Sequence, residues 1–350
     1  MTIKLLRLPF LALIKIVEFM RSNDRVLISF CSSKMEKLVK MVKWHIDSMQ
    51  YVCHLRQTII VLRSANRDYS GSFIIEAVYE FNENSEIFTD EISGWQYGFS
   101  KHQSIDQDED STSVQVLGET QRFSRMIFHN RIRNLFQTQP ALEVNVYPNF
   151  ELSELFIFEG MNNFRLCGDA NHDTSANYAE AYFSKARNLN CAVVSTPISP
   201  GLSSRSKLTT AKYLYFENTS DNAKTLPLHF NGQRAIFHRC KCDRKTLVAI
   251  IQRWLTNKGF QNLHALEINS YGTLPHRFGQ NLPEIDSRPW DRLRRPEVFE
   301  NEYSAWKIPI TQPSITIIQI LKSRVFFEEK TENIDLVVNG TLLKFAIIVP

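Results

Sequence analysis

Helical and strand patterns alternate from about residue 119 onwards, and this alternation constrains the fold more than any other feature of the chain. The helical pattern "TQRFSRMIFHNRIRNLF" precedes "ALEVNVY", "TSANYAEAYFSKARNL" precedes "CAVVST", and "DRKTLVAIIQRWLTNKGF" precedes "LHALEINS". Strands that alternate with helices pack in parallel with the helices as a second layer. The order therefore predicts a parallel α/β layer in this part of the chain.

The strands of this region share an apolar-x-x-apolar-x-apolar form, the strand step of a leucine-rich-repeat-like curved sheet. The positions are Ala141/Val144/Val146, Leu189/Ala192/Val194, Ala211/Leu214/Phe216 and Leu263/Leu266/Ile268. Their spacing is uneven, so we expect an irregular repeat. The residues between them would point outward, in a row of Tyr, Glu and Asn side chains that suits a protein surface. These candidate binding residues are Asn145, Tyr147, Tyr215, Glu217, Glu267 and Asn269. The alternative is that helices or long loops cover them.

The segment before the alternating region reads as β-rich. Residues 57 to 98 contain two β-rich runs around an Asp-Tyr-Ser-Gly turn, which predicts a hairpin. Residues 101 to 113 are polar and acidic without an apolar period, and we expect a mobile loop there. The last residues, from about 314, read as strands with an Asn-Gly turn at 339 and 340 that favours a tight hairpin. The fold class expected for the whole chain is α+β or α/β.

The N-terminal stretch "LLRLPFLALIKIVEFM" raises a separate question, because a helix this apolar needs a partner. Residues 8 to 49 read as three short helices, and Pro9 suits the first turn of the first helix. Four explanations compete for the apolar start: a signal peptide, a membrane anchor, an ordinary core helix, or a face meant for another protein. The uncharged run from Leu8 to Ile14 is too short to span a membrane, and no small-residue cleavage site follows. We therefore expect no membrane segment.

Composition and charge narrow the function classes. The 350 residues suffice for two domains or for one large domain with an appendage. A net charge of +4 is too small to indicate a nucleic-acid-binding protein. We expect the basic clusters at 34–43 and 292–295 to be solvated faces. Six scattered cysteines without framework spacing indicate reduced thiols. The expected location is intracellular, in the cytoplasm, the nucleus or both.

The sequence carries no catalytic signature. It has no Gly-rich phosphate loop, no G-x-S-x-G and no H-E-x-x-H motif. His238, Cys240 and Cys242 could share one strand face and bind zinc, but no further ligands follow at finger-like spacing. The stretch "CGDANHD" at 167–173 gathers metal-ligating residue types, and an Asx-rich turn explains it better. We expect neither a cofactor nor a metal.

The first forty-odd residues resemble an F-box, the three-helix module that docks on a Skp-type adaptor. Leu8-Pro9 matches the Leu-Pro start of that motif, and Leu27, Ile28, Cys31 and Leu38 follow at matching intervals. Ser33-Lys34 resembles a step common in nematode-type versions, whereas Phe10-Leu11, Arg25 and Met35 depart from the pattern. The resemblance implies adaptor contacts on the apolar first-helix positions. Those residues are Leu8, Pro9, Leu13, Ile16, Val17 and Met20, of which some must form the core of so small a module.

A second resemblance lies further along the chain. "CDRKTLVAIIQRWLTNKGFQNLHALEI", residues 242 to 268, is similar to the type 2 F-box-associated domain, whose signature is a helix with a Trp near its end, a polar-Gly break and Leu-x-x-Leu-x-Ile. The resemblance implies an F-box at 4–48, a β-rich connecting region at 49–118 and an F-box-associated domain at 119–350.

Together the two resemblances imply a non-catalytic substrate receptor of an SCF-type (Skp–cullin–F-box) ubiquitin ligase. Its partners would be a Skp-type adaptor, the cullin ligase and an unknown protein target. Two other classes stay open. An α/β scaffold protein would pack its apolar helix internally, and a basic nucleic-acid-associated protein would bind in a strongly salt-dependent way. A zinc enzyme at residues 238–242 is a more distant fourth.

Overall fold

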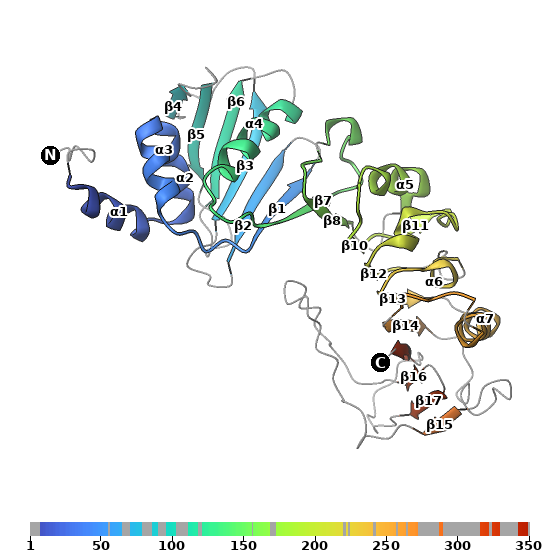
Figure 1. The fold of residues 1–350 in the computed structure, drawn as a ribbon. Coiled ribbons are helices and arrows are strands. Elements are labelled where there is room, and N and C mark those ends of the chain that lie inside the picture. The colour runs from blue at the N-terminus through green and yellow to red at the C-terminus, as the bar shows by residue number, and fades with distance from the viewer. Residues whose placement is uncertain are drawn as a thin grey trace, which may run out of the picture. The chain divides into compact units, whose positions relative to one another are not determined.

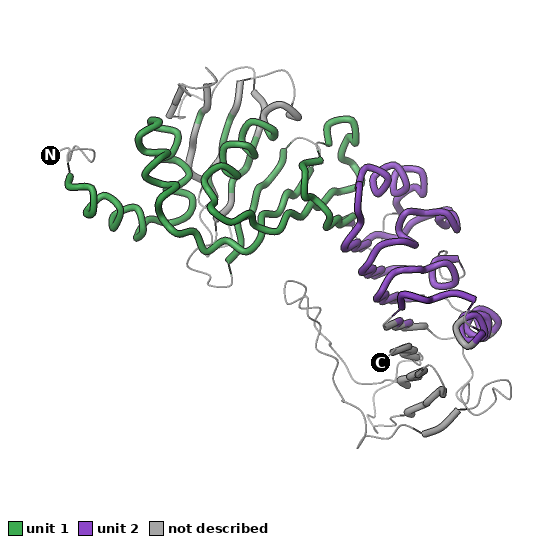
Figure 2. Tube along the Cα trace, in the orientation of Figure 1, with its two compact units in different colours: residues 1–167 green, residues 168–350 purple. Residues whose placement is uncertain are grey.

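The structure, a computed structural model, divides into two compact units, residues 1–167 and 168–350 (Figure 2). The residues that it describes are 8–54, 57–64, 71–78, 86–89, 96–102, 111–117, 121–155, 157–168, 173–219, 222, 225–240, 243–256, 258–263, 265–271, 287–289, 316–321, 324–329 and 342–348. Each unit is described by itself below.

The first unit begins with the predicted helices α1 (Phe10–Phe19), α2 (Ser22–Cys31) and α3 (Ser33–Met41) (Figure 1). Pro9 stands directly before α1, and its carbonyl accepts the Leu13 N–H at 3.1 Å. Ser32 caps α3, because its hydroxyl accepts the Met35 N–H at 3.2 Å. The expectation of three short helices is confirmed. Of the helices in the described residues, none has the length and apolar character that crossing a membrane requires.

A mixed sheet follows the helices. Its strands in chain order are β1 (Ser48–Cys53), β2 (Thr58–Arg63), β3 (Gly71–Val78), β4 (Glu86–Thr89), β5 (Gln96–His102), β6 (Ser111–Leu117), β7 (Ala141–Val146) and β8 (Met161–Leu166). Within this unit they lie in the order β8-β7-β1-β2-β3-β6-β5-β4. β8, β7 and β1 are parallel, and β1, β2 and β3 are antiparallel.

Two expectations for the β-rich region meet different outcomes. The predicted hairpin is confirmed, because β2 and β3 pair antiparallel, although residues 65–70 of its turn lie outside the described residues. The loop predicted at 101–113 is wrong at both ends, since β5 continues to His102 and β6 starts at Ser111. The prediction failed because polar residues in these strands are buried. Thr112 is one of them, and its hydroxyl accepts the Asn23 side-chain N–H at 3.4 Å. Residues 103–110 lie outside the described part of the chain.

Helix α4 (Gln121–Arg133) packs on one face of this sheet. Its Phe128 ring stacks on Phe30 of α2 at 5.7 Å and meets Phe73 of β3 edge-on at 5.5 Å between centroids. All three rings are buried. A helix of the N-terminal module, α4 and the sheet thus share one aromatic core.

The second unit repeats a helix-then-strand order. Strands β10 (Cys191–Val194), β12 (Tyr213–Phe216), β13 (Arg234–Cys240) and β14 (Ala265–Tyr271) are parallel neighbours. Figure 1 shows α5 (Ala176–Ser184), α6 (Leu226–His229) and α7 (Arg244–Leu255) along one side of these strands. The 3-10 turns η3 (Leu152–Glu154) and η4 (Lys207–Thr210) belong to the first and second units. Of the inward positions predicted from the apolar form, only Ala141, the first residue of β7, is exposed; the others are buried.

The remaining strands complete the second unit. A small sheet pairs β9 (Thr174–Ser175) with β11 (Ile198–Ser199). Beyond β14 come β15 (Ser287–Pro289), β16 (Thr316–Leu321), β17 (Arg324–Glu329) and β18 (Leu342–Ile348). β18 pairs with β14 and β16. The Asn-Gly turn predicted at 339 and 340 lies outside the described residues. The expected domain boundaries at 48/49 and 118/119 stay predictions, and α4, β7 and β8 belong to the first compact unit.

Helix α4 carries a histidine that is buried without charge. The His129 ring is fully buried, its Nδ1 is hydrogen-bonded to the Tyr51 hydroxyl, and its face stacks on Phe158 at 3.5 Å between centroids. Desolvation, with a smaller contribution from the Arg133 charge, lowers the pKa of His129 from 6.5 to about 3. The imidazole is therefore neutral in the folded protein at neutral pH.

This burial predicts an acid-sensitive fold. Between about pH 3 and pH 6.5 the unfolded chain protonates His129 and the folded chain does not, so stability is lost as the pH falls below 6.5. The expected slope for this one group is at most about 1.4 kcal/mol per pH unit. A Tyr51→Phe/His129→Phe variant replaces both hydrogen-bonding partners with rings of similar shape and lacks this slope. Urea unfolding of both proteins at about pH 7.5 and about pH 5 measures it. A stability difference that stays constant over this range would contradict the expectation.

Candidate protein-binding surface on the N-terminal helices

Helix α1 exposes large apolar side chains. Phe10 is 52% exposed, Leu11 75% and Phe19 89%, and Met41 at the end of α3 is 56% exposed. Among the described residues these are the large hydrophobic side chains that remain exposed. An apolar surface of this kind on a folded protein commonly marks a contact with another macromolecule. We refer to these exposed residues of α1, Phe10 and Leu11 in its first turn and Phe19 at its end, together as the α1 outer face.

The residues predicted to contact a partner divide between the core and the surface. Leu13 is 5% exposed and Val17 is fully buried, because residues four apart lie on one helix face and this face packs inward. Leu8, Ile16 and Met20 are half-buried and Pro9 is exposed. The α1 outer face was missed as a site, since a helix that is apolar nearly all round gives no polar stripe to mark its outer side.

A buried arginine holds the end of α1. Arg25 of α2 is 1% exposed, and its guanidinium donates to the carbonyls of Glu18, of Met20 (2.9 Å) and of Lys43 (3.4 Å). It also lies 5.5 Å from the centre of the Trp44 ring. A cation at the carboxyl end of a helix satisfies orphan carbonyls and complements the helix dipole. Arg25, a departure from the F-box pattern, therefore orients α1 in this chain.

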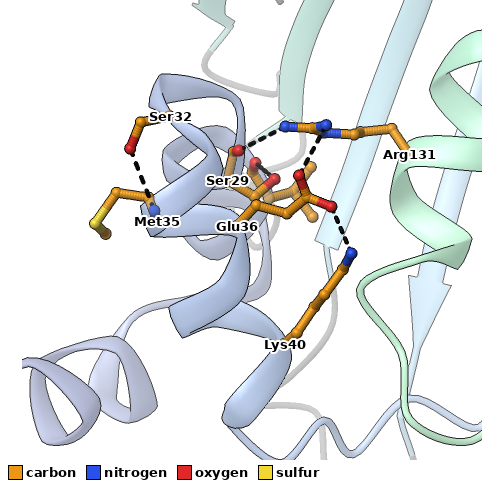
Figure 3. Close-up of polar contacts among 7 residues, drawn as sticks. Ser29, Ser32, Met35, Glu36, Lys40 and Arg131 are labelled. Atoms are coloured by element: carbon orange, nitrogen blue, oxygen red, sulfur yellow. Dashed lines mark hydrogen bonds and ion pairs between the residues drawn. The ribbon is translucent and has the colours of Figure 1, made fainter. Parts of the chain in front are cut away.

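A second arginine joins the helices to α4, as Figure 3 shows. Arg131 of α4 forms an ion pair with Glu36 of α3 at 3.0 Å and donates to the Ser29 carbonyl of α2 at 2.9 Å. The other Glu36 oxygen receives Lys40 at 2.6 Å. Glu36 and Arg131 keep only 9% and 10% of their side-chain surface exposed. One guanidinium thus fixes the positions of three helices.

The candidate binding residues predicted from the curved-sheet pattern differ in how far they are buried. Asn145, expected to point outward, is 6% exposed. Tyr147 is half-buried and stacks on His54 at 4.2 Å between ring centroids. Tyr215 and Glu217 of the second unit are half-buried, and the Tyr215 ring lies 5.3 Å from that of His238. The side chains of Glu267 and Asn269 lie outside what the structure describes.

The alternative sites gain no support from geometry. Cys240 is buried, His238 is half-buried and Cys242 lies outside the described residues, as do Asp169 and His172. Within the described part of the chain no group of three or more His, Cys, Asp or Glu side chains is placed to hold a metal ion. Burial raises the pKa values of Cys53 and Cys167 to about 11, so both thiols are protonated at neutral pH and are poor nucleophiles.

Of the two basic clusters, the structure describes the one at 34–43. In the 34–43 cluster, Lys34, Lys37 and Lys43 are exposed, whereas Lys40 is engaged with Glu36. The cluster at 292–295 lies outside the described residues.

Comparison with known proteins identifies the N-terminal helices. The sequence model of the F-box domain matches residues 5–47, which span α1, α2 and α3. No curated protein and no solved structure matches the chain. An F-box domain binds a Skp-type adaptor in cullin complexes and implies a general role in substrate recognition by an SCF ubiquitin ligase. F-box proteins are typically non-catalytic subunits of such complexes.

Removing the Arg25 guanidinium should loosen α1. Arg25→Met is expected to lower the free energy of unfolding by about 3 kcal/mol, because buried carbonyls lose a charged donor. Arg25→Lys should restore only part of this loss, since one ammonium cannot reach carbonyls at both ends of the guanidinium. Hydrogen exchange at α1 amides and urea unfolding measure the two effects. Unchanged protection of α1 in Arg25→Met would show that other contacts orient the helix.

The Glu36–Arg131 pair should be strongly coupled. Either Glu36→Gln or Arg131→Met is expected to cost about 3 kcal/mol, because each leaves a buried charge with fewer partners. The double variant should cost clearly less than the sum of the two. Glu18→Gln, which breaks the exposed Lys15–Glu18 pair at 2.6 Å, should cost less than about 1 kcal/mol. A double-mutant cycle by urea unfolding tests the coupling, and additive losses would refute it.

Proposed function

We propose that this protein is the substrate-recognition subunit of an SCF-type ubiquitin ligase, and that its α1 outer face docks on a Skp-type adaptor. The observation that carries the proposal is that Phe10, Leu11 and Phe19 are exposed on a helix that lies within the F-box match. The same helix is held from behind by Leu13, Val17 and Arg25. A rigid apolar face loses little conformational entropy on binding.

The energetics favour a partner on this face. Burying a large apolar side chain stabilises an interface by about 1.5–3 kcal/mol. Lys15 and Glu18, which pair with one another on α1, supply the polar border. Leu8, Pro9, Ile16 and Met20 would add contacts around the exposed residues, whereas Leu13 and Val17 would act indirectly by supporting the helix.

The chain itself would perform no chemistry. Its contribution would be proximity, since tethering a target near a ubiquitin-loaded enzyme raises the local concentration of acceptor lysines. The remainder of the chain would bind the target, with Asn145, Tyr147, Tyr215, Glu217, Glu267 and Asn269 as the proposed contact residues. We place the protein inside the cell, in the cytoplasm, the nucleus or both.

We also propose that the chain after the F-box is a type 2 F-box-associated domain of the nematode type, with leucine-rich-repeat-like geometry. The support is the sequence pattern around residues 242–268 and the parallel strands β10, β12, β13 and β14 with helices between them. The domain limits proposed from the sequence are 4–48, 49–118 and 119–350.

The two rival classes predict other surfaces. A scaffold protein with α1 packed internally would hide Phe10, Leu11 and Phe19, and their exposure supports the adaptor instead. A nucleic-acid-associated protein would rely on basic residues such as Lys34, Lys37 and Lys43, and its binding would weaken steeply with salt.

Adaptor capture tests the proposal. Leu11→Asp and Phe19→Asp should each weaken binding of a purified Skp-type adaptor by about tenfold or more, because each places a charge in an apolar contact. Capture by the unaltered chain should persist at high salt. Both residues are exposed, so circular dichroism and urea unfolding should be unchanged.

Two control variants sharpen the experiment. Ala181→Asp introduces the same charge at an exposed helical position of the second unit and should leave capture intact. Val17→Asp puts a charge into the fully buried core and should unfold the helices, so its loss of capture carries no information about contact. No capture by the folded, unaltered chain would refute the ligase assignment.

A further inference from the structure

The sheet of the first unit has two faces of opposite character. On one face Tyr51, Val144 and Phe164 alternate into the core that α4 covers, and all three are buried. The residues between them belong to the other face, because successive side chains of a strand point to opposite sides. We call this the polar face; it is formed by Gln50, Val52 and His54 of the β1 segment, Ile59, Val61 and Arg63 of β2, Glu143, Asn145 and Tyr147 of the β7 segment, and Asn163, Arg165 and Cys167 of the β8 segment.

Hydrogen bonds cross the polar face from strand to strand. Arg63 donates to the Gln50 side-chain oxygen at 3.0 Å, and the Gln50 amide donates to the Glu143 carboxylate at 3.1 Å. Desolvation raises the pKa of Glu143, while the hydrogen bond and nearby arginines oppose the rise. Glu143 is the sole acidic residue of β1, β2, β7 and β8, and it is buried. The basic residues of these four strands are exposed Arg63 and half-buried Arg165.

Asn145 lies at the centre of this face. Its register partners are Val52 of β1 and Arg165 of β8. It is 6% exposed, yet its side-chain oxygen has no hydrogen-bond partner. A buried acceptor left unpaired destabilises a protein, and an apolar residue of the same size would avoid that cost. A ligand that donates an N–H to this oxygen would remove that cost.

An aromatic platform lies at the adjacent edge. His54 and Tyr147 directly follow β1 and β7, and their rings stack at 4.2 Å with 22° between their planes. Both are half-buried, so part of each ring faces solvent. Ligands of α/β sheets bind at the carboxyl ends of parallel strands, which is the edge where this platform lies.

We propose that the polar face of β1, β7 and β8 binds an extended acidic peptide segment of a target protein, an assignment of the binding surface that rests on the proposed function. The peptide backbone donates an N–H to the Asn145 oxygen. Its carboxylates pair with Arg165 and Arg63, and a flat side chain packs on the His54–Tyr147 platform. Two arginines against one buried carboxylate, that of Glu143, select against basic peptides.

The test measures peptide binding to the purified full chain. The probe is a fluorescein-labelled peptide, Gly-Ser-Glu-Tyr-Glu-Ser-Gly, and the comparison peptide carries Gln in place of each Glu. By fluorescence anisotropy at physiological salt, the acidic peptide should bind about tenfold or more tightly than the neutral one. Arg165→Gln and Arg63→Gln should each remove much of this preference. Arg205→Gln, the same change at an exposed position of the second unit, should leave it intact.

Asn145→Leu separates binding from folding. If the Asn145 side chain contacts a ligand, the variant should bind the acidic peptide about tenfold more weakly, while its urea midpoint is unchanged or higher. A lower midpoint with unaltered peptide affinity would assign Asn145 to the fold and overturn the proposal. Equal affinity of the unaltered chain for both peptides would also overturn it.

Adaptor capture by the same preparations keeps the two proposals apart. The polar-face variants should capture the adaptor as the unaltered chain does. Peptide preference without adaptor capture would overturn the ligase role and leave the peptide site standing. Adaptor capture without any peptide preference would overturn the peptide site alone.

Discussion

The contact of Arg131 with α2 and α3 is the constraint on which the rest of the first unit depends. Its guanidinium reaches the Glu36 carboxylate and the Ser29 carbonyl from α4, a helix that follows them by about a hundred residues. Beside it, Phe128 completes the ring stack with Phe30 and Phe73. The N-terminal helices would leave a buried acid and a buried ring uncovered without α4. The N-terminal helices of this chain therefore share a core with α4 and the sheet.

That attachment explains how one short helix serves two purposes. Leu13 and Val17 fill the core, while Phe10, Leu11 and Phe19 stay in solvent. The bonds of Arg25 to the carbonyls of Glu18 and Met20 hold the carboxyl end of α1 in one orientation. The cost of exposing apolar surface is thus offset by polar contacts on the opposite side.

Local patterns in the sequence predicted the helices of residues 8–49, the β2–β3 hairpin and most inward strand positions, since apolar periodicity reports which face is buried. They could not predict Arg25 or Arg131 as anchors. Arg131 has partners about a hundred residues away, and Arg25 donates to backbone carbonyls, which no side-chain pattern marks. They also missed the ends of β5 and β6: Thr112 and Gln115 are buried polar residues, so their strand lacked the apolar alternation that marks one. The outer side of α1 gave no signal because both sides are apolar.

The polar face raises the question of what a sheet gains from such residues. Gln50, Glu143, Asn145 and Asn163 are each less than a tenth exposed, and apolar side chains there would spare the desolvation of an acid and of amides. Valine or isoleucine would also suit a strand better. Stability alone therefore does not account for these four polar residues. A surface whose polar groups are fixed in place by their own hydrogen bonds is prepared for a ligand that completes the set, and the half-exposed rings and arginines around it give that ligand its shape and charge.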